Sequence, residues 1–581
     1  MSSTGVRSVD DRRHDLRKRF EVWTPRTLDG WLDDCAQRYG DRPLVITDDA
    51  VLTYAEVAKQ SRVLADGLVS LGVRPGDRVG MLMANYPEFV AIKFAIARTG
   101  AIAIPFNYLY RADELGYVLE QSECSVLLTM TGFGGLDYLA MLDVIAPDWD
   151  RGATWKHLRN VITLSTDGGH RDGALTLDGL VERGRANPGA ASGAVHEPTD
   201  IGDMLYTSGS TGSPKGVTVT HDAVLRTGYA SALTRAYDDG RRILFSLPCY
   251  HMFGYVEGIL SAMVVGGAVI LQTSFSAEGY LAGIERHRAD DILCVPTMAV
   301  AMVESPARDS HDLSSLSAIL CGSAPAPIWL WEQVEGVFGV SEIVTGYGMT
   351  ECGGAMTLTR PEDELILTST TVGRPKMAGA AGVPGADELC VYSTIDPATG
   401  EALPPGEVGE LVSHGPTTMM GYWNKPAETA AALGTDGLLR SGDLGRVRPD
   451  GYLEVTGRSK ELYKSGGELV MPKEIEDIVG ALDAVSQVFA VGVVDDRWGE
   501  IGALVVVRAP GHDITAAEIL EHCRERLARF KVPKRVEFLD VTALPTTPTG
   551  KIQKFRLVEM VSKSISGTSS APEPDHERSS S

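Results

Sequence analysis

A segment whose side chains could bind phosphate lies at residues 206–217, with the sequence YTSGSTGSPKGV. Its glycines let backbone N–H groups approach anionic oxygens, its hydroxyl groups add donors, and Lys215 adds a point charge. It follows a short apolar run at 204–206, so we expect a strand that leads into a loop. The Walker A pattern is absent because Gly216 follows Lys215, and the composition therefore predicts a different kind of polyphosphate site. A flexible surface linker is the alternative interpretation.

Later positions carry side chains that could complete a nucleotide site. In TGYGMTE at 345–351, two glycines beside an aromatic ring allow a flat base to approach, while Thr350 and Glu351 could hold hydrated magnesium. Asp443 follows a Ser-Gly turn, where a carboxylate can accept two hydrogen bonds from ribose hydroxyls. His251 follows an apolar strand pattern. Each residue also has a structural alternative, since Glu351 could be a solvated strand end, Asp443 a turn residue and His251 a satisfied core or loop histidine.

Together these segments resemble the signatures of the adenylate-forming superfamily, which contains acyl-CoA synthetases, luciferases and the adenylation domains of peptide synthetases. The matching strings occur in the family's order and span the chain from about Trp23 to Leu557. They are YTSGSTGSPKGV at 206–217, P-x-x-H-x-x-G at 248–254, TGYGMTE at 345–351, GRP at 373–375, LRSGDLG at 439–445, GRSKE at 457–461 and PTGKI at 548–552. The string KSGGE at 464–468 resembles the acyl-CoA synthetase, or fatty-acid:CoA ligase, branch.

The resemblance implies an ATP-dependent carboxylic acid:CoA ligase that forms an acyl-adenylate and releases AMP and pyrophosphate, with ATP, Mg²⁺ and coenzyme A as cofactors. Lys551 is implied to bridge the carboxylate and the α-phosphate, and to be catalytic together with His251 and Glu351. Thr207 and Glu351 are implied to hold the metal. The implied nucleotide- and coenzyme-binding residues are Thr207, Ser208, Gly209, Ser210, Thr211, Gly212, Lys215, Gly322, Ser323, Ala324, Gly346, Tyr347, Gly348, Met349, Thr350, Asp443, Arg458, Lys464, Gly466 and Gly467.

The resemblance implies separate groups of residues for the ribose and phosphates, for adenine and for the acid. Asp443 and Arg458 would contact the ribose and phosphate side, while Gly322-Ser323-Ala324 and Tyr347 would sandwich adenine. The implied acid pocket is formed by His251, Tyr255, Val256, Met298, Gly322, Gly346 and Gly354. Many of these residues are small, which favours a roomy pocket. A fatty acid and a cyclic or aryl acid both stay candidates.

The resemblance also implies a second half-reaction, in which the smaller domain rotates about the hinge residue Lys460. Rotation withdraws Lys551 and brings the 464–468 loop to the site, where glycines leave room for pantetheine. Two departures from the family pattern border this loop, namely LVMP at 469–472 for the usual Asn-Val-Tyr-Pro and Tyr463 for a smaller residue. The alternative function is therefore acyl transfer to an amine or to a carrier-protein pantetheine. A silent nucleotide sensor and a luciferase-like oxygenase are further hypotheses, and an intact Lys551 disfavours the sensor.

The elements that must position these residues alternate between helix and strand. Helices are expected at 28–39, 54–72 and 87–99, and strands at 43–47, 78–83 and 101–105. This alternation predicts parallel sheets with helical crossovers. Residues 131–198 show no sharp periodicity and are expected to form a surface insertion.

The predicted fold class is α/β. From the resemblance we expect a large N-terminal domain of two α/β sheet layers plus a β-barrel-like portion, joined to a small mobile α+β C-terminal domain. The predicted boundaries are an N-terminal tail at 1–20, the adenylate-forming domain at 21–457, a hinge at 458–461, the mobile domain at 462–562 and a disordered tail at 563–581.

The length, net charge and cysteine spacing of the chain disfavour several classes of protein. The chain of 581 residues is long for one domain, and its net charge of −23 disfavours nucleic-acid and anionic-membrane binders. The eight cysteines show no metal-ligand spacing, which fits a reduced, cytoplasmic protein. The charged N-terminus lacks a signal-peptide core, and the apolar run 258–271 is too short to span a bilayer. We expect small-molecule partners, no nucleic acid and no stable membrane insertion, and leave a homodimer open.

Overall fold

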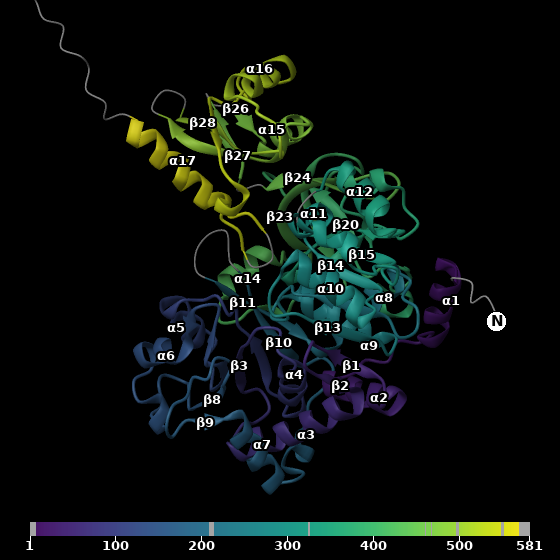
Figure 1. Cartoon of the computed structure of the whole chain (residues 1–581), viewed down its shortest axis with the longest axis vertical. Helices are drawn as coiled ribbons and strands as arrows, with labels where there is room; N and C mark the ends of the chain where they lie inside the picture. The colour runs from purple at the N-terminus through teal and green to yellow at the C-terminus, as the bar shows by residue number, and fades with distance from the viewer. Residues whose placement is uncertain are drawn as a thin grey trace, which may run out of the picture. The chain divides into compact units, whose positions relative to one another are not determined.

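The computed structural model of the chain describes residues 7–207, 214–323, 326–458, 461–465, 468–495, 499–547 and 551–568. The chain divides into two units (Figure 1). Unit 1 comprises Met1–Ser393, Val412–Ser441 and Val447–Glu454, and unit 2 comprises Thr394–Leu411, Gly442–Arg446 and Val455–Ser581. The expected α/β fold with a large N-terminal part and a smaller C-terminal part is confirmed.

One sheet of unit 1 carries the candidate phosphate loop. Its strands, in spatial order, are β22 (Gly421–Tyr422), β11 (Lys215–Thr220), β10 (Ile201–Thr207), β4 (Ile102–Pro105), β3 (Arg78–Leu82), β5 (Val126–Met130), β8 (Asn160–Leu164) and β9 (Leu175–Thr176). From β10 to β9 the neighbours are parallel, whereas β11 pairs antiparallel with β10 and with β22. Parallel neighbours need crossover connections, and α4 (Glu88–Arg98) and α5 (Ala112–Gln121) supply them.

A second sheet of unit 1 brings several candidate site segments to one edge. Its strands, in spatial order, are β16 (Glu342–Val344), β15 (Ala318–Cys321), β14 (Asp291–Cys294), β12 (Arg242–Phe245), β13 (Ala268–Leu271), β1 (Pro43–Ile46) and β2 (Val51–Thr53). The pairs from β16 to β1 are parallel. The segments that follow β15 and β16, with Gly322 and Gly346, therefore leave at the same edge, where open α/β sheets bind ligands.

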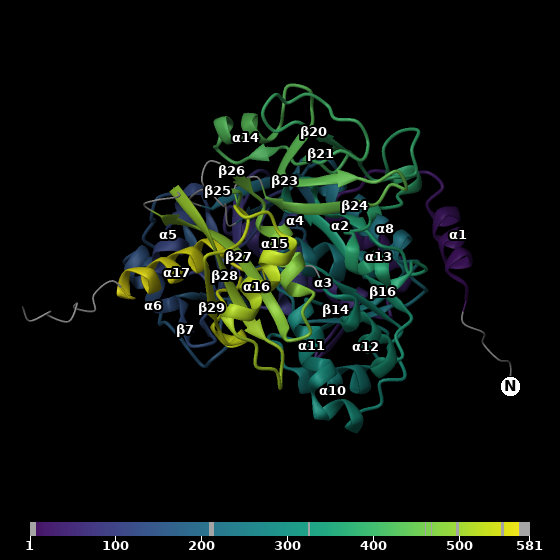
Figure 2. The same ribbon diagram turned by 90° about the horizontal axis from the view of Figure 1, so that it is seen from above.

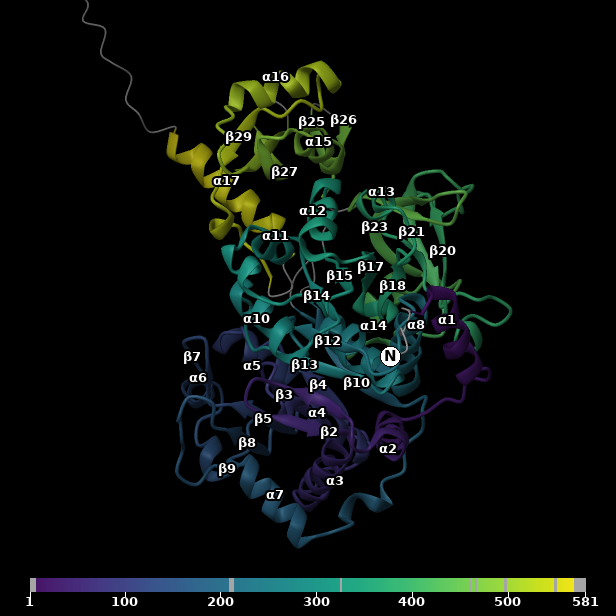
Figure 3. The ribbon, with the colours of Figure 1, turned by 45° about the vertical axis from the view of Figure 1, so that its right-hand side comes forward.

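Helices α2 (Leu28–Tyr39), α3 (Tyr54–Ser70), α4 and α7 (Leu177–Ala186) form a packed group in unit 1 (Figure 3). The helices expected at 28–39, 54–72 and 87–99 are thus confirmed, with small differences at their ends. A capping box starts α3, because the Thr53 hydroxyl accepts from the Glu56 N–H and the Glu56 carboxylate accepts from the Thr53 N–H. Among the helices in the described ranges, none is long and apolar enough to cross a bilayer.

The expectation of a surface insertion at 131–198 is wrong for several of its segments. β8 and β9 extend the first sheet, and Val161 and Ile162 of β8 are buried against it. Helices α6 (Tyr138–Ile145) and α7 also fall in this range. Such short strands, separated by loops rich in Gly and Asp, give too few residues for a period to be recognised.

The N-terminal segment expected to be a tail contains a helix, α1 (Val9–Arg19). Arg12 pairs with Glu342, Arg13 forms a bidentate pair with Glu362 at 2.6 and 2.9 Å, and Arg17 forms one with Asp387 at 2.6 Å. Arg12 and Arg13 are buried. These partners lie hundreds of positions away in the sequence. The ion pairs that hold the N-terminal arginines could therefore not be predicted from the sequence.

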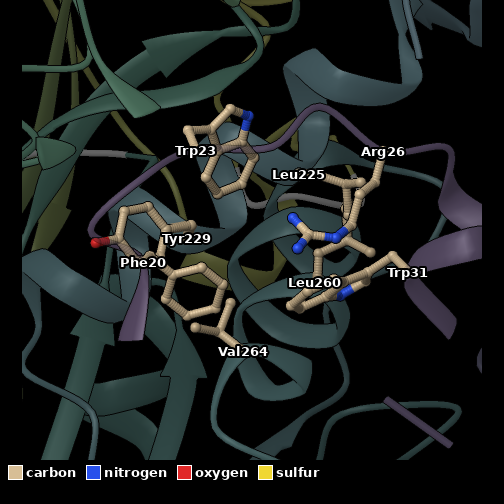
Figure 4. Close-up of a pocket in the computed structure, with 8 residues that line it drawn as sticks. All are labelled: Phe20, Trp23, Arg26, Trp31, Leu225, Tyr229, Leu260 and Val264. Carbon is tan, nitrogen blue, oxygen red and sulfur yellow. The ribbon is translucent and has the colours of Figure 1, made fainter. Parts of the chain in front are cut away.

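In the segment after α1, a cluster of aromatic side chains packs against the rest of unit 1 (Figure 4). The Phe20 ring centroid lies 4.7 Å from that of Tyr229, and the Trp23 indole donates to Asp222 at 2.8 Å. Tyr229 and Asp222 belong to α8 (His221–Thr234). Together with Trp31, these rings line a small pocket against α8. The segment preceding α2 is therefore fixed to α8.

The C-terminal part of unit 2 is an α+β arrangement with helices on both faces of one sheet (Figure 2). In spatial order its strands are β26 (Glu468–Val470), β25 (Tyr463–Ser465), β28 (Gly499–Arg508) and β27 (Val485–Asp495), with β29 (Arg535–Phe538) beside β28. Leu504 and Val506 pack with α15 (Pro472–Gly480) and α16 (Ala516–Arg526). The alternate residues Val505 and Val507 pack with α17 (Lys554–Thr568) on the other face, as the period of a strand requires.

The portion expected to be barrel-like consists of two small sheets. One contains β17 (Gly346–Met349), β18 (Gly354–Leu358) and β19 (Arg374–Pro375). The other contains, in spatial order, β20 (Val391–Ile395), β21 (Gly409–His414), β23 (Leu439–Val447) and β24 (Leu453–Arg458). The candidate magnesium and ribose residues lie on these sheets or directly after their strands.

A half-buried ion pair in unit 1 should make stability depend on pH. His196 Nε2 lies 2.9 Å from Asp29 Oδ1, and this hydrogen bond raises the pKa of His196. Burial opposes ionisation of Asp29, yet the hydrogen bond to His196 lowers its pKa to about 2. The stabilisation is therefore present below the usual histidine pKa and lost as pH rises through the raised one. It is also present above the usual aspartate pKa and lost as pH falls towards about 2.

We expect Asp29→Asn to lower the free energy of unfolding by about 1 kcal/mol near pH 5.5 and by clearly less near pH 8.5. The physical reason is that His196 loses its charge, and with it most of the attraction, at the higher pH. Urea unfolding of both proteins at the two pH values measures the difference. An equal loss at both values would show that Asp29 acts through packing and not through the ion pair.

Candidate active site

The candidate phosphate loop joins two paired strands. β10 ends at Thr207 and β11 begins at Lys215, and these two residues face each other in the antiparallel register. The loop residues predicted between them, Ser208, Gly209, Ser210, Thr211 and Gly212, lie outside the described residues. A Cβ on Gly216 would lie 2.8 Å from the Met204 sulfur, so a larger residue there would displace the Met204 side chain. The predicted strand leading into this loop is confirmed.

Glu351 is held by contacts on both its backbone and its side chain. It lies in the short helix η5 (Thr350–Cys352) directly after β17, and both Thr350 and Glu351 are buried. Its carbonyl accepts from the Met419 N–H at 2.8 Å. Its carboxylate accepts from the Tyr422 hydroxyl at 2.8 Å. A solvated Glu351, the structural alternative, is thereby excluded.

Tyr422 connects the carboxylate to the lysine of the phosphate loop. The Lys215 ammonium lies 5.0 Å from the centre of the Tyr422 ring, within cation–π distance. Burial raises the pKa of Tyr422, and the neighbouring Glu351 raises it further, so the hydroxyl stays a donor. One side chain therefore positions a cation and an anion that the sequence separates by more than a hundred residues.

No role was predicted for Tyr422 from the sequence. The reason is that its strand, β22, contains two residues and is defined by pairing with β11. Val217 faces Tyr422, and the Trp423 N–H donates to the Gly216 carbonyl at 2.8 Å. A strand of this length leaves no period in the sequence.

We expect Tyr422→Phe to slow acyl-adenylate formation about 10-fold and to raise the Mg²⁺ concentration needed for half-maximal rate. Phenylalanine keeps the ring beside Lys215 but removes the hydroxyl that orients Glu351. Pyrophosphate release measured across a Mg²⁺ titration tests this. Tyr54→Phe is the matched control, because the Tyr54 hydroxyl donates to the Gly267 carbonyl at 2.7 Å in a buried setting on α3. Equal effects of the two variants would contradict a role for Tyr422 at the metal.

The predicted adenine residues lie at the edge of the second sheet. Gly322 follows β15, and a Cβ on it would lie 3.5 Å from the Phe253 ring and 4.0 Å from the Gly346 carbonyl. Ser323 adopts a φ of 73°, a left-handed conformation that is rare for serine and recurs at functional sites. Gly322 and Gly346 are thus brought together, as predicted. Ala324 lies outside the described residues.

His251 precedes a π-helical segment, η3 (Phe253–Leu260). Its Nδ1 accepts from the Phe253 N–H at 3.2 Å, so a neutral ring carries its proton on Nε2. Such segments occur frequently at functional sites. His251 is partly exposed and precedes the helix in a loop, so it is not a core residue, and its bonded Nδ1 matches the alternative of a satisfied loop histidine.

The predicted acid-pocket residues do not all lie together. Gly354 faces Met252, since a Cβ on it would lie 3.5 Å from the Met252 Cβ. The Tyr255 hydroxyl instead donates to Asp203 of β10 at 3.1 Å, and Lys93 of α4 lies 2.6 Å from the same carboxylate. Val256 is buried in η3, and Met298 is buried in α11 (Pro296–Glu304). Sequence reasoning missed Met252 and Phe253, which immediately follow His251.

Unit 2 contains the remaining candidate residues. Arg458 Nε lies 3.0 Å from Asp443 Oδ1, so the predicted ribose and phosphate-side residues form an ion pair. The Lys551 N–H donates to the Thr547 hydroxyl at 3.0 Å, and the Lys551 carbonyl accepts from the Thr547 N–H at 2.8 Å. Lys464 lies in β25, whereas Lys460, Gly466 and Gly467 lie outside the described residues.

Tyr463, a departure from the family pattern, is a core residue of unit 2. It is buried among the side chains of that unit's core. A Cβ on Gly492 would lie 2.3 Å from the Tyr463 Cβ, and one on Gly502 would lie 2.2 Å from its hydroxyl. These two glycines leave the space that the large side chain needs. The substitution is therefore accommodated by packing inside the unit.

The donor set fits magnesium bound together with phosphates. No group of three or more His, Cys, Asp or Glu side chains within the described ranges could hold a metal alone. Mg²⁺ is commonly held by one or two carboxylates, waters and substrate phosphates, and not by an all-protein cage. Glu351, whose carboxylate accepts from the Tyr422 hydroxyl, could supply one such carboxylate. The Thr207 hydroxyl, at the end of β10, is a second oxygen at the loop.

The chain is similar to known proteins over nearly its full length. The AMP-binding enzyme family model matches residues 32–423, and the AMP-binding enzyme C-terminal domain model matches residues 474–551. A 7a-methyl-1,5-dioxo-octahydro-1H-inden-4-yl propanoyl:CoA ligase of Mycobacterium tuberculosis is 33% identical over 92% of this chain and 99% of its own. A feruloyl-CoA synthase of an Amycolatopsis species is 36% identical over 87% of this chain and 92% of its own.

A solved structure gives the same assignment. The o-succinylbenzoate CoA synthetase of Bacillus subtilis, in complex with its acyl-adenylate intermediate, superposes with a TM-score of 0.73 at 27% identity, covering 92% of this chain and 98% of its own. The chain therefore belongs to the AMP-binding enzyme family, in its acyl-CoA synthetase branch, whose members are AMP-forming acid–thiol ligases.

Proposed function

We propose that this protein activates a carboxylic acid with ATP as an acyl-adenylate and transfers the acyl group to coenzyme A. AMP and pyrophosphate are the other products. The observation that carries the proposal is the Lys215, Tyr422 and Glu351 arrangement, which places a cation and an oriented carboxylate beside the phosphate-loop strands.

In the first half-reaction a carboxylate oxygen attacks the α-phosphorus, although both reactants are anions. Positioned cations and N–H groups lower the barrier by neutralising charge that develops at the α-phosphate and on the departing pyrophosphate. Lys551 bridges the carboxylate and the α-phosphate, and Lys215 binds the β- and γ-phosphates. Asp443 accepts from the ribose hydroxyls, and Arg458 holds Asp443 in place. Bound Mg²⁺ supplies further neutralisation of the phosphates.

In the second half-reaction the thiol of coenzyme A attacks the acyl carbon, and AMP leaves. We assign the hinge to 458–461, with Lys460 as its central residue, between a domain at 21–457 and a mobile domain at 462–562. Lys464, Gly466 and Gly467 then border the thiol. Acyl transfer to an amine or a carrier-protein pantetheine is the alternative, and relatives named as CoA ligases favour free coenzyme A.

The acid itself is proposed to be cyclic or aryl. Two relatives carry names of ring-containing acyl groups, the dioxo-octahydroindenyl propanoyl and the feruloyl groups. A cytoplasmic location fits the eight cysteines, all of which are free and buried within the described ranges.

Pyrophosphate release across a panel of aliphatic, cyclic and aryl acids, each with and without coenzyme A, tests the proposal. We expect one ring-containing class to turn over with coenzyme A and to yield its thioester by mass spectrometry. Pyrophosphate release without thioester formation would instead indicate that an amine or a carrier protein accepts the acyl group. No release with any acid would contradict acid activation.

A further inference from the structure

Glu257 of η3, one turn beyond Phe253, forms a buried ion pair with Lys376, which follows β19. Lys376 Nζ lies 2.6 Å from Glu257 Oε1 and donates to the Ser231 hydroxyl at 2.7 Å. Both charged residues are essentially inaccessible, with 0% and 1% of their side chains exposed. None of the proposed steps of adenylation or thioester formation uses this pair.

The geometry of η3 directs Glu257 to the same side as Phe253. Because a π-helix closes its hydrogen bonds between residues five apart, residues four or five apart share a face. Phe253, whose ring lies beside Gly322, and Glu257 therefore share one face, whereas Tyr255 points to Asp203 on the opposite face. Glu257 thus lies one turn deeper on the side of the candidate acid site.

Helix α8 also leads from the candidate acid site to the ion pair. Thr227 of α8 lies beside Gly354, with its Cγ2 atom 3.8 Å from where a Cβ on that glycine would be. Ser231 follows one turn later, and its hydroxyl donates to the Thr227 carbonyl at 2.8 Å and receives the Lys376 ammonium. Both η3 and α8 therefore run from the walls of the acid site to the ion pair.

The Glu257 carboxylate keeps one acceptor atom unused. Its Oε2 is buried and has no hydrogen-bond partner among the residues that the structure describes. Buried polar atoms are nearly always paired, because an unpaired acceptor loses its hydration without compensation. A carboxylate oxygen accepts and cannot donate, so its missing partner must be an O–H or N–H group.

We propose that Glu257 recognises a hydroxyl group at the far end of the acid, so that the preferred substrates are ring-containing acids with a distal hydroxyl. This inference rests on the proposed function. The acid's carboxylate faces the nucleotide, its ring lies between Phe253, Gly322 and Gly354, and its hydroxyl donates to Glu257 Oε2. Lys376 holds the carboxylate in place and compensates its charge. Glu257 is a specificity residue and takes no part in the chemical steps.

Matched pairs of acids that differ by one hydroxyl test the proposal. The probes are 3-phenylpropanoic acid against 3-(4-hydroxyphenyl)propanoic acid, and cinnamic acid against 4-hydroxycinnamic acid. We expect kcat/KM for thioester formation to favour the hydroxylated member at least 10-fold, because a site built to bind a hydroxyl discriminates against an analogue that lacks it. Equal kcat/KM values within both pairs, with thioesters formed, would overturn this inference and leave the proposed function standing.

Variants connect the preference to the residue. Glu257→Gln should reduce the preference to less than about 3-fold by slowing the hydroxylated acids while leaving the unsubstituted acids nearly unchanged. The double variant Glu257→Gln with Lys376→Met removes both charges, and it covers the case in which an unpaired Lys376 impairs folding. Ser231→Ala, which removes one partner of Lys376 and leaves the carboxylate, should keep the preference. A folded Glu257 variant that slows both members of a pair equally would contradict the assignment.

Discussion

Lys551→Ala is expected to lower the rate of acyl-adenylate formation by roughly 10² to 10³ while leaving thioester formation from supplied acyl-adenylate largely intact. The lysine is proposed to contact the α-phosphate and the carboxylate in the adenylation transition state, and to be withdrawn for thiol attack. Single-turnover measurements of the two half-reactions, started with acid plus ATP or with synthetic acyl-adenylate plus coenzyme A, separate them.

Two variants control this result. Lys551→Arg retains the charge but changes its geometry, so a partial loss of adenylation is expected. Lys563→Ala removes an exposed lysine of α17 and should leave both half-reactions unchanged. An equal loss of both half-reactions in Lys551→Ala would contradict the account in which one site is used in two arrangements.

Glu351→Gln is expected to lower adenylation by roughly 10² to 10³ and to raise the Mg²⁺ requirement. Glutamine keeps the size of the side chain and its contact with Tyr422, but it lacks the charge that a magnesium ligand needs. Pyrophosphate release measured against Mg²⁺ concentration tests both effects. Glu335→Gln, at an exposed position of α12 (Ile328–Phe338), is the matched control. Unchanged Mg²⁺ dependence in Glu351→Gln would remove this residue from the metal site.

The fold class could be predicted from the sequence because the patterns of its strands and helices are local, whereas the roles of the site residues stay predictions. A glycine-rich string such as TGYGMTE can be recognised from seven consecutive residues alone. The parallel strands behind Gly322 and Gly346 are short apolar runs with helices between them, and the family order fixed their place. Features with a local signal were therefore predicted.

The rest depends on partners distant in the sequence. Tyr422 acquires its role from Lys215 and Glu351, and Glu257 acquires its role from Lys376 and Ser231. A single sequence shows neither pairing, because long-range side-chain contacts follow from the packing of elements and not from the period of any one element. Helix α1 escaped prediction for the same reason.

The central claim, attack of a carboxylate oxygen on the α-phosphorus, is tested most directly by isotope transfer. An acid labelled with oxygen-18 in its carboxylate, converted to its thioester by the enzyme, should deliver one labelled oxygen to AMP for each thioester formed. The pyrophosphate should carry no label, because it leaves with the oxygen that bridged the α- and β-phosphates, whereas the labelled carboxylate oxygen bonds to the α-phosphorus and stays in AMP. Label in pyrophosphate or inorganic phosphate, or unlabelled AMP beside the thioester, would contradict the acyl-adenylate mechanism.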